Sequence, residues 1–429
     1  MNKNQKLPLA IVADILGTSK KVVNSWSENK LKPIIDKKTG KKFFHLDELR
    51  SLPSASFLFE TKWDEEERIK PQRNYKIIEL FAGAGGLALG LEKAGFQSLL
   101  LNEIDRDACE TLKKNRVNWN VKNCDIKEYD FTKFKGEVDL LTGGFPCQAF
   151  SYAGKKLGFN DTRGTLFYEF ARAVKETNPK VILAENVKGL VSHDSGKTLE
   201  TIKNIIEEIG YELVEPKILK AIFYKVPQKR ERIFLVAIRK DLSRFVSFNY
   251  PAKFPKIFTL RDALKKGDLF NKDVPKTEGQ IYPQRKKEIL SKVPQGGYWR
   301  DLPDDLQREY MRGSYFLGGG KTGLARRLSW DEPSLTLTCA PAQKQTERCH
   351  PNETRPLTFR EYARIQTFPD EWQFCGSLSS IYKQIGNAVP VNLAYAVGRS
   401  LINLLNEIEN HEIQKTNLKE LNFNDLKAS

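Results

Sequence analysis

The 429-residue chain has few of the residues that build metal sites or disulfide frameworks. It contains six Cys and four His, and no two cysteines stand in a CxxC pair. In a chain of this length scattered cysteines do not form a disulfide framework, and the absence of ligand spacing argues against a zinc knuckle. Each cysteine therefore has to be judged individually.

Long apolar runs are also lacking. No stretch approaches the roughly 20 apolar residues that cross a bilayer. The N-terminal apolar run is short, is interrupted by Asp14 and lacks a small-residue cleavage site. We therefore expect no signal peptide, no membrane span and a cytoplasmic location. With 40% hydrophobic and 29% charged residues the composition is that of a soluble globular chain, and the length suggests two or three domains.

The charge is unevenly balanced. Seventy Lys and Arg against 54 Asp and Glu give a formal net charge of +16. This excess favours contact with a polyanion, with nucleic acid as the first candidate and an anionic membrane surface as the second. A basic surface without a partner is the alternative.

Residues 1–70 predict a small accessory domain. PLAIVADILG indicates a short helix that ends at Gly17, KKVVNSWSENKL a second helix, and HLDELRSL a third. Residues 37–40 form a turn between two apolar runs, which indicates a hairpin. This order resembles a winged helix-turn-helix of the excisionase or MerR-like kind, and an accessory unit that only packs is the alternative. The charged segment ETKWDEEERIKPQRN that follows is typical of a linker.

The remainder predicts an α/β protein. In residues 74–242 short apolar strands alternate with helices, which indicates a doubly wound, mostly parallel sheet. In such a sheet ligands bind at the carboxyl ends of the strands. Residues 243–345 predict a smaller irregular domain, residues 346–405 a return to the first, and residues 406–429 a polar tail.

The irregular domain is basic. Residues 251–300 hold twelve Lys or Arg and five Asp or Glu, interleaved with aromatic residues. This pattern favours contact with a polyanion. A solvated basic insertion without function is the alternative.

A glycine turn follows the first predicted strand of this α/β domain. Gly83, Gly85 and Gly86 allow a helix N-terminus to approach a ligand closely. Glu103 ends the next strand, where a carboxylate can accept hydrogen bonds from ribose hydroxyls. Taken alone, this pattern predicts a nucleoside-containing cofactor and leaves open both a NAD enzyme and a turn that merely packs.

Reactive side chains follow the next strands in order. Cys147 lies in a turn at the end of a strand, where a thiol is placed like a nucleophile. Glu185 ends the following strand and is positioned for acid chemistry. Arg230 and Arg232 stand before a further strand, where guanidinium groups could hold a carboxylate or a carbonyl.

These segments together resemble the motifs of DNA (cytosine-5) methyltransferases. FAGAGG, NEID, CDI, GGFPCQAFS, DTRGTLF, ENVKGL, PQKRERIF, PSLTLT and QIGNAVPVN occur in the family's order over residues from about 75 to 405. The resemblance implies a class I methyltransferase-type, Rossmann-like sheet, with residues 243–345 as the target-recognition domain. It also implies S-adenosylmethionine as methyl donor and a cytosine in duplex DNA as acceptor. A hydride enzyme has no use for the PCQ and ENV pair, so the NAD hypothesis fails.

The family implies a role for each matching residue. Cys147 is similar to the nucleophile that adds to C6 of cytosine, and Glu185 to the acid that hydrogen-bonds N3. Arg232, with Arg230, matches the pair that orients this carboxylate and the cytosine O2. For the base that removes the C5 proton the family pattern offers no side chain, and water is plausible.

The resemblance also implies which residues bind the cofactor and the DNA. The cofactor set is Phe81, Gly83, Gly85, Glu103, Asp125, Ile126, Pro146, Leu166, Asn387 and Val389, and the DNA-binding set is Gln148, Ser151 and Thr336. Three positions depart from the family pattern: Glu79 replaces a usual Asp, Cys124 a common Gly, and Lys225 a frequent Gly. None of the three removes a reacting group.

The resemblance implies the modification enzyme of a restriction–modification system, paired with a restriction endonuclease and expected to act as a monomer on double-stranded DNA. Two other hypotheses remain open. The N-terminal domain could repress transcription of its own operon, in which case deleting residues 1–70 should leave methylation intact. Alternatively, the substrate could be tRNA, although the long basic segment argues against it.

Overall fold

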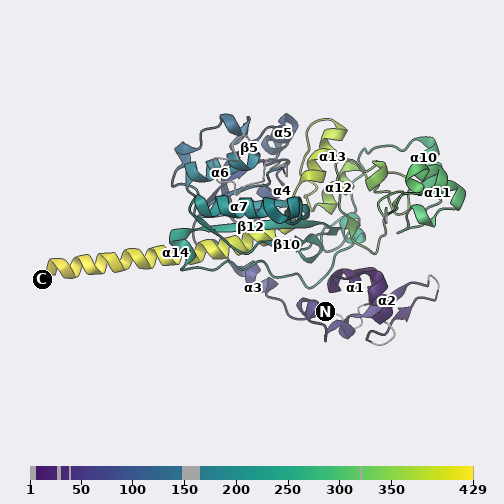
Figure 1. The fold of residues 1–429 in the computed structure, drawn as a ribbon, viewed down its shortest axis with the longest axis horizontal. Coiled ribbons are helices and arrows are strands. Elements are labelled where there is room, and N and C mark those ends of the chain that lie inside the picture. Colours follow the sequence, from purple (N-terminus) through teal and green to yellow (C-terminus); the bar gives the residue numbers. More distant parts are fainter. Residues whose placement is uncertain (1–5, 27–29, 38–39, 147–164, 319–320, 429) are drawn as a thin grey trace.

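The computed structural model describes residues 6–26, 30–37, 40–146, 165–318 and 321–428. A large domain is built on an eight-stranded sheet, a smaller lobe lies beside it, and an N-terminal unit lies below both in the view of Figure 1.

The central sheet confirms the predicted α/β architecture. Its strands are β4 (Tyr75–Leu80), β5 (Phe96–Glu103), β6 (Val121–Asn123), β7 (Leu140–Gly143), β8 (Val181–Val187), β9 (Tyr211–Leu213), β10 (Lys217–Lys220) and β12 (Glu231–Arg239). The order is β10-β12-β8-β7-β4-β5-β6, with β9 paired to β12. The strands from β4 to β8 are parallel to their neighbours, whereas β12 runs antiparallel to β8, β9 and β10. The parallel strands therefore all end at one edge.

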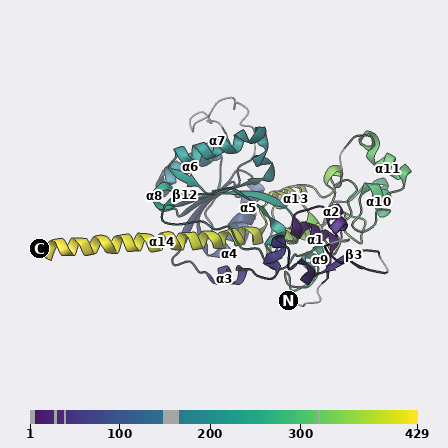
Figure 2. The same ribbon diagram turned by 60° about the horizontal axis from the view of Figure 1, so that its bottom comes forward.

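Helices cover both faces of this sheet. They are α4 (Gly86–Ala94), α5 (Arg106–Asn115), α6 (Leu166–Thr177), α7 (Lys197–Glu208), α8 (Lys240–Ser243) and α14 (Val391–Ala428). Because side chains alternate along a strand, Val181 and Leu183 of β8 join the core under α4 and α14. Ile182 and Ala184 join the core under α6 and α7. Figure 2 shows the two layers on opposite sides of the sheet.

The contact between α4 and α14 is very close at Gly90. A Cβ on this residue would lie 2.3 Å from the Cβ of Ala394 and 2.6 Å from the carbonyl oxygen of Val391. The Gly90→Ala variant is therefore expected to lose about 2 kcal/mol of unfolding free energy, since overpacking a dense core forces the backbone to shift. Denaturant titration measures the loss. Gly267→Ala, where nothing lies within 4 Å of the added carbon, is the control, and equal stability of the two variants would contradict the packing.

The smaller lobe has short helices joined by long connecting segments. It contains α10 (Gln284–Ser291), α11 (Asp304–Met311) and connecting loops, and its own core is formed by Tyr282, Leu290, Trp299, Met311 and Leu324 among others. The elements α9 (Leu260–Leu264), β13 (Ser334–Leu335), α12 (Phe359–Ile365) and α13 (Leu378–Asn387) connect this lobe to the sheet. Residues of α9 share a core with α12 and α13, so the packing crosses the expected boundary at residue 243.

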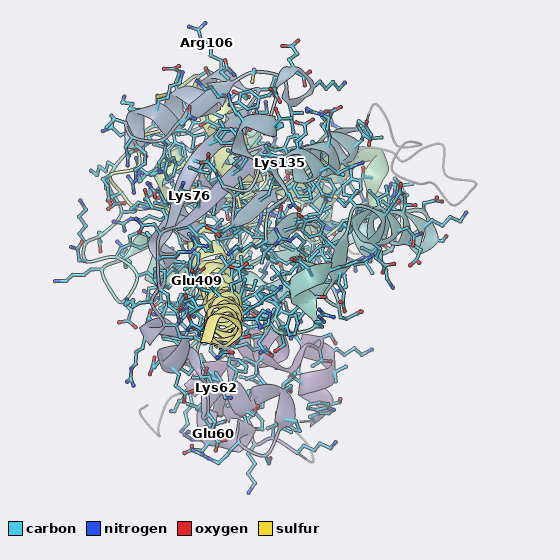
Figure 3. All side chains as sticks on the ribbon, turned by 90° about the vertical axis from the view of Figure 1, so that its left-hand side faces the viewer. Glu60, Lys62, Lys76, Arg106, Lys135 and Glu409 are labelled. Atoms are coloured by element: carbon cyan, nitrogen blue, oxygen red, sulfur yellow. The ribbon has the colours of Figure 1, made fainter. Side chains whose placement is uncertain are left out.

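The N-terminal unit has two of the three predicted helices and the predicted pair of antiparallel strands. It contains β1 (Lys6–Pro8), α1 (Leu9–Leu16), α2 (Lys20–Trp26), β2 (Ile34–Ile35) and β3 (Lys42–His45), with β1 and β2 both antiparallel to β3. Gly17 ends α1 in the left-handed conformation, at φ 66°. The expected third helix is only a 3₁₀ turn, Leu46–Leu49. In Figure 3 this unit, which continues to Glu60 and Lys62, lies below the α/β domain.

The prediction of a linker after this unit is wrong. The segment forms α3 (Trp63–Arg68), and the Trp63 side chain is completely buried. The guanidinium carbon of Arg399 lies 4.0 Å from the ring centroid of Trp63, and Arg399 also donates a hydrogen bond to its carbonyl. One large apolar side chain therefore anchors a segment whose average composition is charged.

The C-terminal residues continue the core helix. Within α14, Leu405 and Ile408 are both fully buried, so the expected boundary at residue 406 is not a structural one. Figures 1 and 2 show the last turns of α14 extending beyond the sheet. The stretch from Leu378 to Asn417 is long and apolar enough to cross a membrane, but 78% of its most apolar window is buried inside the fold, as in the core helix of a soluble protein.

Candidate active site

The loops after β4, β5, β7 and β8 surround a cavity of about 520 Å³. Eight of the predicted site residues line it: Phe81, Gly83, Glu103, Pro146, Glu185, Arg232, Asn387 and Val389. Five come from the ends of four parallel strands, Arg232 from the start of antiparallel β12, and Asn387 and Val389 from the end of α13 and the segment after it. The parallel register explains this, because it brings the carboxyl ends of the strands to one edge.

The glycine turn is tied to the end of β5. The Gly83 amide donates a hydrogen bond of 2.7 Å to Glu103 Oε2, and the Asp105 amide one of 2.8 Å to Oε1. Phe81 adopts a φ of 57°, in the left-handed region. Because both oxygens of Glu103 accept backbone N–H groups, its carboxylate fixes the wall on which a cofactor would rest.

The returning segment packs directly on this turn. A Cβ on Gly86 would lie 2.3 Å from the carbonyl oxygen of Val389, so only glycine fits there. Val389 itself is buried, and Asn387 is exposed at the end of α13.

Four predicted cofactor residues lie outside the cavity lining. Gly85 precedes α4 with a φ of 84°, and its missing side chain makes room for Leu112. Asp125 accepts a hydrogen bond from the Lys127 amide, and Ile126 is buried in the core. Leu166 is the first residue of α6 and packs against that same core.

Glu185 and Arg232 form the central polar pair. Arg232 Nε lies 2.7 Å from Glu185 Oε1, and both side chains are mostly buried. Burial raises the pKa of Glu185, and the charges of Arg232 and Arg230 oppose this effect. A carboxyl group in this setting can hold a proton and deliver it to a base that enters the cavity.

Arg230 does not join this pair. Its guanidinium donates hydrogen bonds of 3.3 Å to the carbonyl oxygens of Leu337 and Asn387. Burial lowers its pKa to about 9, which leaves it charged at neutral pH. Of the pair expected to orient this carboxylate and the cytosine O2, Arg232 contacts the carboxylate. Arg230 instead joins its own segment to Leu337 and to the end of α13.

The other predicted residues have different outcomes. Thr336 donates a hydrogen bond of 2.6 Å to the Lys229 carbonyl and is half-buried. Cys147, Gln148 and Ser151 lie outside the described residues. Pro146, which directly precedes Cys147, is exposed at the cavity.

Among the lining residues that were not predicted to bind a ligand, two have features that suit binding or affect stability. Ile104 directly follows Glu103, and 67% of its surface is exposed although it is apolar, which suits contact with a flat ring. Glu79 is buried at the cavity wall, and its Oε2 has no hydrogen-bond partner among the described residues. In the sequence, Ile104 stands out as an apolar residue directly after the acid that ends β5. Glu79 stands out as an acid within the otherwise apolar strand β4.

Glu79 makes the stability of the ligand-free protein depend on pH. Burial raises its pKa well above the ordinary value, the backbone of Ala88 opposes this, and Glu103 adds to it. A group whose pKa is raised on folding stabilises the protein fully below its unfolded pKa, and this contribution is lost as the pH rises through the folded pKa. Glu79→Gln is therefore expected to raise the melting temperature at pH 8 more than at pH 5.

Thermal melts of the ligand-free protein measure this difference. The exposed Glu110→Gln is the control, since Glu110 lies on the surface beside Lys113. A Glu79→Gln variant that melts lower than wild type at pH 8 would contradict the account.

The cavity has the chemistry that a nucleoside cofactor with a sulfonium group needs. An aromatic face (Phe81), an acid wall (Glu103) and apolar side chains (Ile104 and Val389) meet in one space of suitable size. The sheet order and this cavity define the protein as an α/β methyltransferase.

The chain belongs to the C-5 cytosine-specific DNA methylase family, which it matches over residues 75–403. Methyltransferases of this family use S-adenosylmethionine as methyl donor. Among curated relatives, the type II methyltransferase M.Eco47II of Escherichia coli is 64% identical over 94% of this chain and 97% of its own length. M.Sau96I of Staphylococcus aureus is 50% identical over 84% of this chain and 85% of its own.

Solved structures share the fold. A DNA modification methyltransferase encoded in an E. coli prophage superposes with a TM-score of 0.55 at 26% identity, over 78% of this chain and all of the other. The Dnmt2 methyltransferase of S. pombe gives 0.53 at 18% identity, over 78% of this chain and all of the other. At that lower identity only the fold is shared.

Proposed function

We propose that this protein methylates C5 of one cytosine within a short duplex DNA sequence, as the modification enzyme of a restriction–modification system. The observation that carries the proposal is the Glu185–Arg232 pair in the same cavity as the glycine turn. Relatives named as type II methyltransferases support it. A restriction endonuclease of the same specificity is the functional partner, and the enzyme acts on DNA as a monomer.

The residues of the chain supply acid and nucleophilic chemistry. The Cys147 thiolate adds to C6 of the cytosine while the Glu185 carboxyl group donates a proton to N3, so that C5 becomes nucleophilic. S-adenosylmethionine, when bound against Phe81 and Glu103, supplies the electrophilic methyl group that C5 takes. Loss of the C5 proton to water then expels the Cys147 thiolate, and N3 returns its proton to the Glu185 carboxylate as the aromatic ring is restored.

Each lobe has a place in this scheme. The target base must leave the stacked duplex to reach the cavity, at a cost of a few kcal/mol. The target-recognition domain, residues 243–345, holds the DNA opposite the catalytic domain, which comprises residues 74–242 and 346–405. Several of its cations already have acidic partners, such as Lys265 with Asp273 and Arg285 with Glu309. Fewer charges are therefore free for phosphates than the composition suggests.

Transfer of a labelled methyl group tests the proposal. The purified protein is incubated with labelled S-adenosylmethionine and either duplex DNA or tRNA, and the DNA product is sequenced after bisulfite treatment. Label on C5 of cytosine in one recurring sequence is expected, and it would also supply the recognition sequence. Label on tRNA but not on duplex DNA would overturn the choice of substrate.

We also infer a second role for residues 1–70, as a winged helix-turn-helix-like domain that represses its own operon. The helix pair α1 and α2, the β2–β3 hairpin and the exposed Lys21 and Lys37 support it. A Lys21→Glu/Lys37→Glu variant should lose binding to promoter DNA and keep wild-type methylation. Unchanged promoter binding in this double variant would contradict the second role.

A further inference from the structure

The N-terminal unit is not a separable module, because it shares one apolar core with the large domain. Ile11 and Ile15 of α1 belong to the same buried cluster as Phe223 and Val226. The rings of Phe57 and Phe223 meet edge to face, with their centroids 5.1 Å apart. The expectation that deleting residues 1–70 leaves methylation intact does not agree with this packing, since the deletion would expose the shared core.

An ion pair crosses this interface at one point of α1. Asp14 Oδ2 lies 2.9 Å from Lys229 Nζ, and only 20% and 25% of the two side chains are exposed. A second pair, Lys20 Nζ to Glu332 Oε1 at 3.0 Å, joins α2 to the segment before β13, and its lysine side chain is 51% exposed. The first pair is thus shielded from solvent on both sides, whereas the second is open on its cationic side.

Lys229 belongs to the loop that carries the arginines of the active site. Together with Gln228 it forms β11 (Gln228–Lys229), which pairs in parallel with β13. The Lys229 carbonyl accepts the hydrogen bond from Thr336, and the Gln228 side-chain oxygen accepts one of 2.9 Å from the Leu337 amide. Arg230 is the next residue, and Arg232 follows two positions later.

This loop concentrates positive charge. Lys229, Arg230 and Arg232 stand within four consecutive residues, and burial together with the charge of Arg232 lowers the pKa of Arg230. Glu185 provides the anion on the cavity side. On the opposite side Asp14 of the N-terminal unit pairs directly with Lys229, and Glu332, which pairs with Lys20, is a second anion near Lys229.

We propose that Asp14 is a positioning residue for the target-base pocket, which acts through Lys229 on the loop that holds Arg232 against Glu185. The proposal rests on the proposed roles of Glu185 and Arg232. It gives α1 a function in methylation itself, and it makes the N-terminal unit part of the catalytic machinery in addition to any role in binding other DNA.

The test compares Asp14→Asn, Asp14→Glu and Lys229→Met with Lys20→Met, the matched control that breaks the second ion pair of the same unit. For each full-length variant the kcat and the KM for duplex DNA are measured, together with the Kd for S-adenosylmethionine and the melting temperature. Asp14→Asn is expected to lower kcat about 10-fold, because a small displacement of a positioning group is costly in the transition state. Cofactor affinity and melting temperature should stay near wild type, and Asp14→Glu should recover most of the activity.

A double-mutant cycle separates positioning from general stability. Because both residues act through one contact, Asp14→Asn combined with Lys229→Met should be no slower than the worse single variant. Wild-type turnover in Asp14→Asn would overturn the proposal. So would a parallel fall of kcat, cofactor affinity and melting temperature, or an equal effect of Lys20→Met. Full activity in Glu185→Gln, by contrast, would contradict the proposed function of the active site, independently of the result for Asp14.

Discussion

Replacement of Glu185 by Gln is expected to lower kcat by about 10³-fold or more, while cofactor binding stays intact. The amide is nearly isosteric but cannot donate a carboxyl proton, and a positioned general acid contributes about 10²–10⁴ to the rate. The ion pair with Arg232 is lost as well. Single-turnover methylation of duplex DNA measures the chemical step, and equilibrium titration with S-adenosylmethionine measures binding.

The control for this variant is another buried carboxylate with an arginine partner. Asp139 precedes β7 at the opposite edge of the sheet, and its Oδ2 accepts a hydrogen bond of 2.8 Å from Arg73. Asp139→Asn should reduce stability and leave the single-turnover rate of the folded protein unchanged. Equal losses in the two variants would mean that Glu185 supports the fold and takes no part in proton transfer.

Replacement of Cys147 by Ser is expected to lower kcat by about 10⁴-fold or more. A hydroxyl group is a far weaker nucleophile than a thiolate, and removing a covalent nucleophile removes the reaction path itself. Labelled methyl transfer, followed to long times, measures the residual rate.

Cys339 supplies the matched control for the nucleophile. It is exposed, and its Sγ lies 3.2 Å from Oδ1 of Asn387, a residue of the cavity wall. Cys339→Ser should retain activity near that of wild type. A Cys147→Ser variant that is as active as Cys339→Ser would exclude covalent catalysis by Cys147.

Local patterns in the sequence predict the sheet and its reactive edge. Short continuous apolar runs such as Val181 to Ala184 mark strands that are buried on both faces. In a parallel sheet the residues after each strand meet at one edge. The sequence alone therefore predicts that Glu103 and Glu185 lie at the same cavity, as they do.

Other features depend on contacts between distant segments. Arg230 and Arg232 look equivalent in the sequence, and the register of β12 on β8, which pairs Arg232 with Val187, decides which of them reaches Glu185. Trp63 is one apolar residue in a charged segment, and its burial requires Arg399 of α14. The contact between Asp14 and Lys229 joins residues more than 200 positions apart, so no local pattern reveals it.

The most direct test of the account is to trap the bond between Cys147 and the target cytosine. Duplex DNA with 5-fluorocytosine at the methylated position has no C5 proton to lose, so the thioether should persist after methyl transfer. The protein is digested to peptides, and their masses are measured. In the wild-type protein we expect the nucleotide on Cys147 only when S-adenosylmethionine is present. In Cys147→Ser we expect no adduct. A methylated product with no adduct on Cys147, or an adduct on another cysteine, would contradict the mechanism.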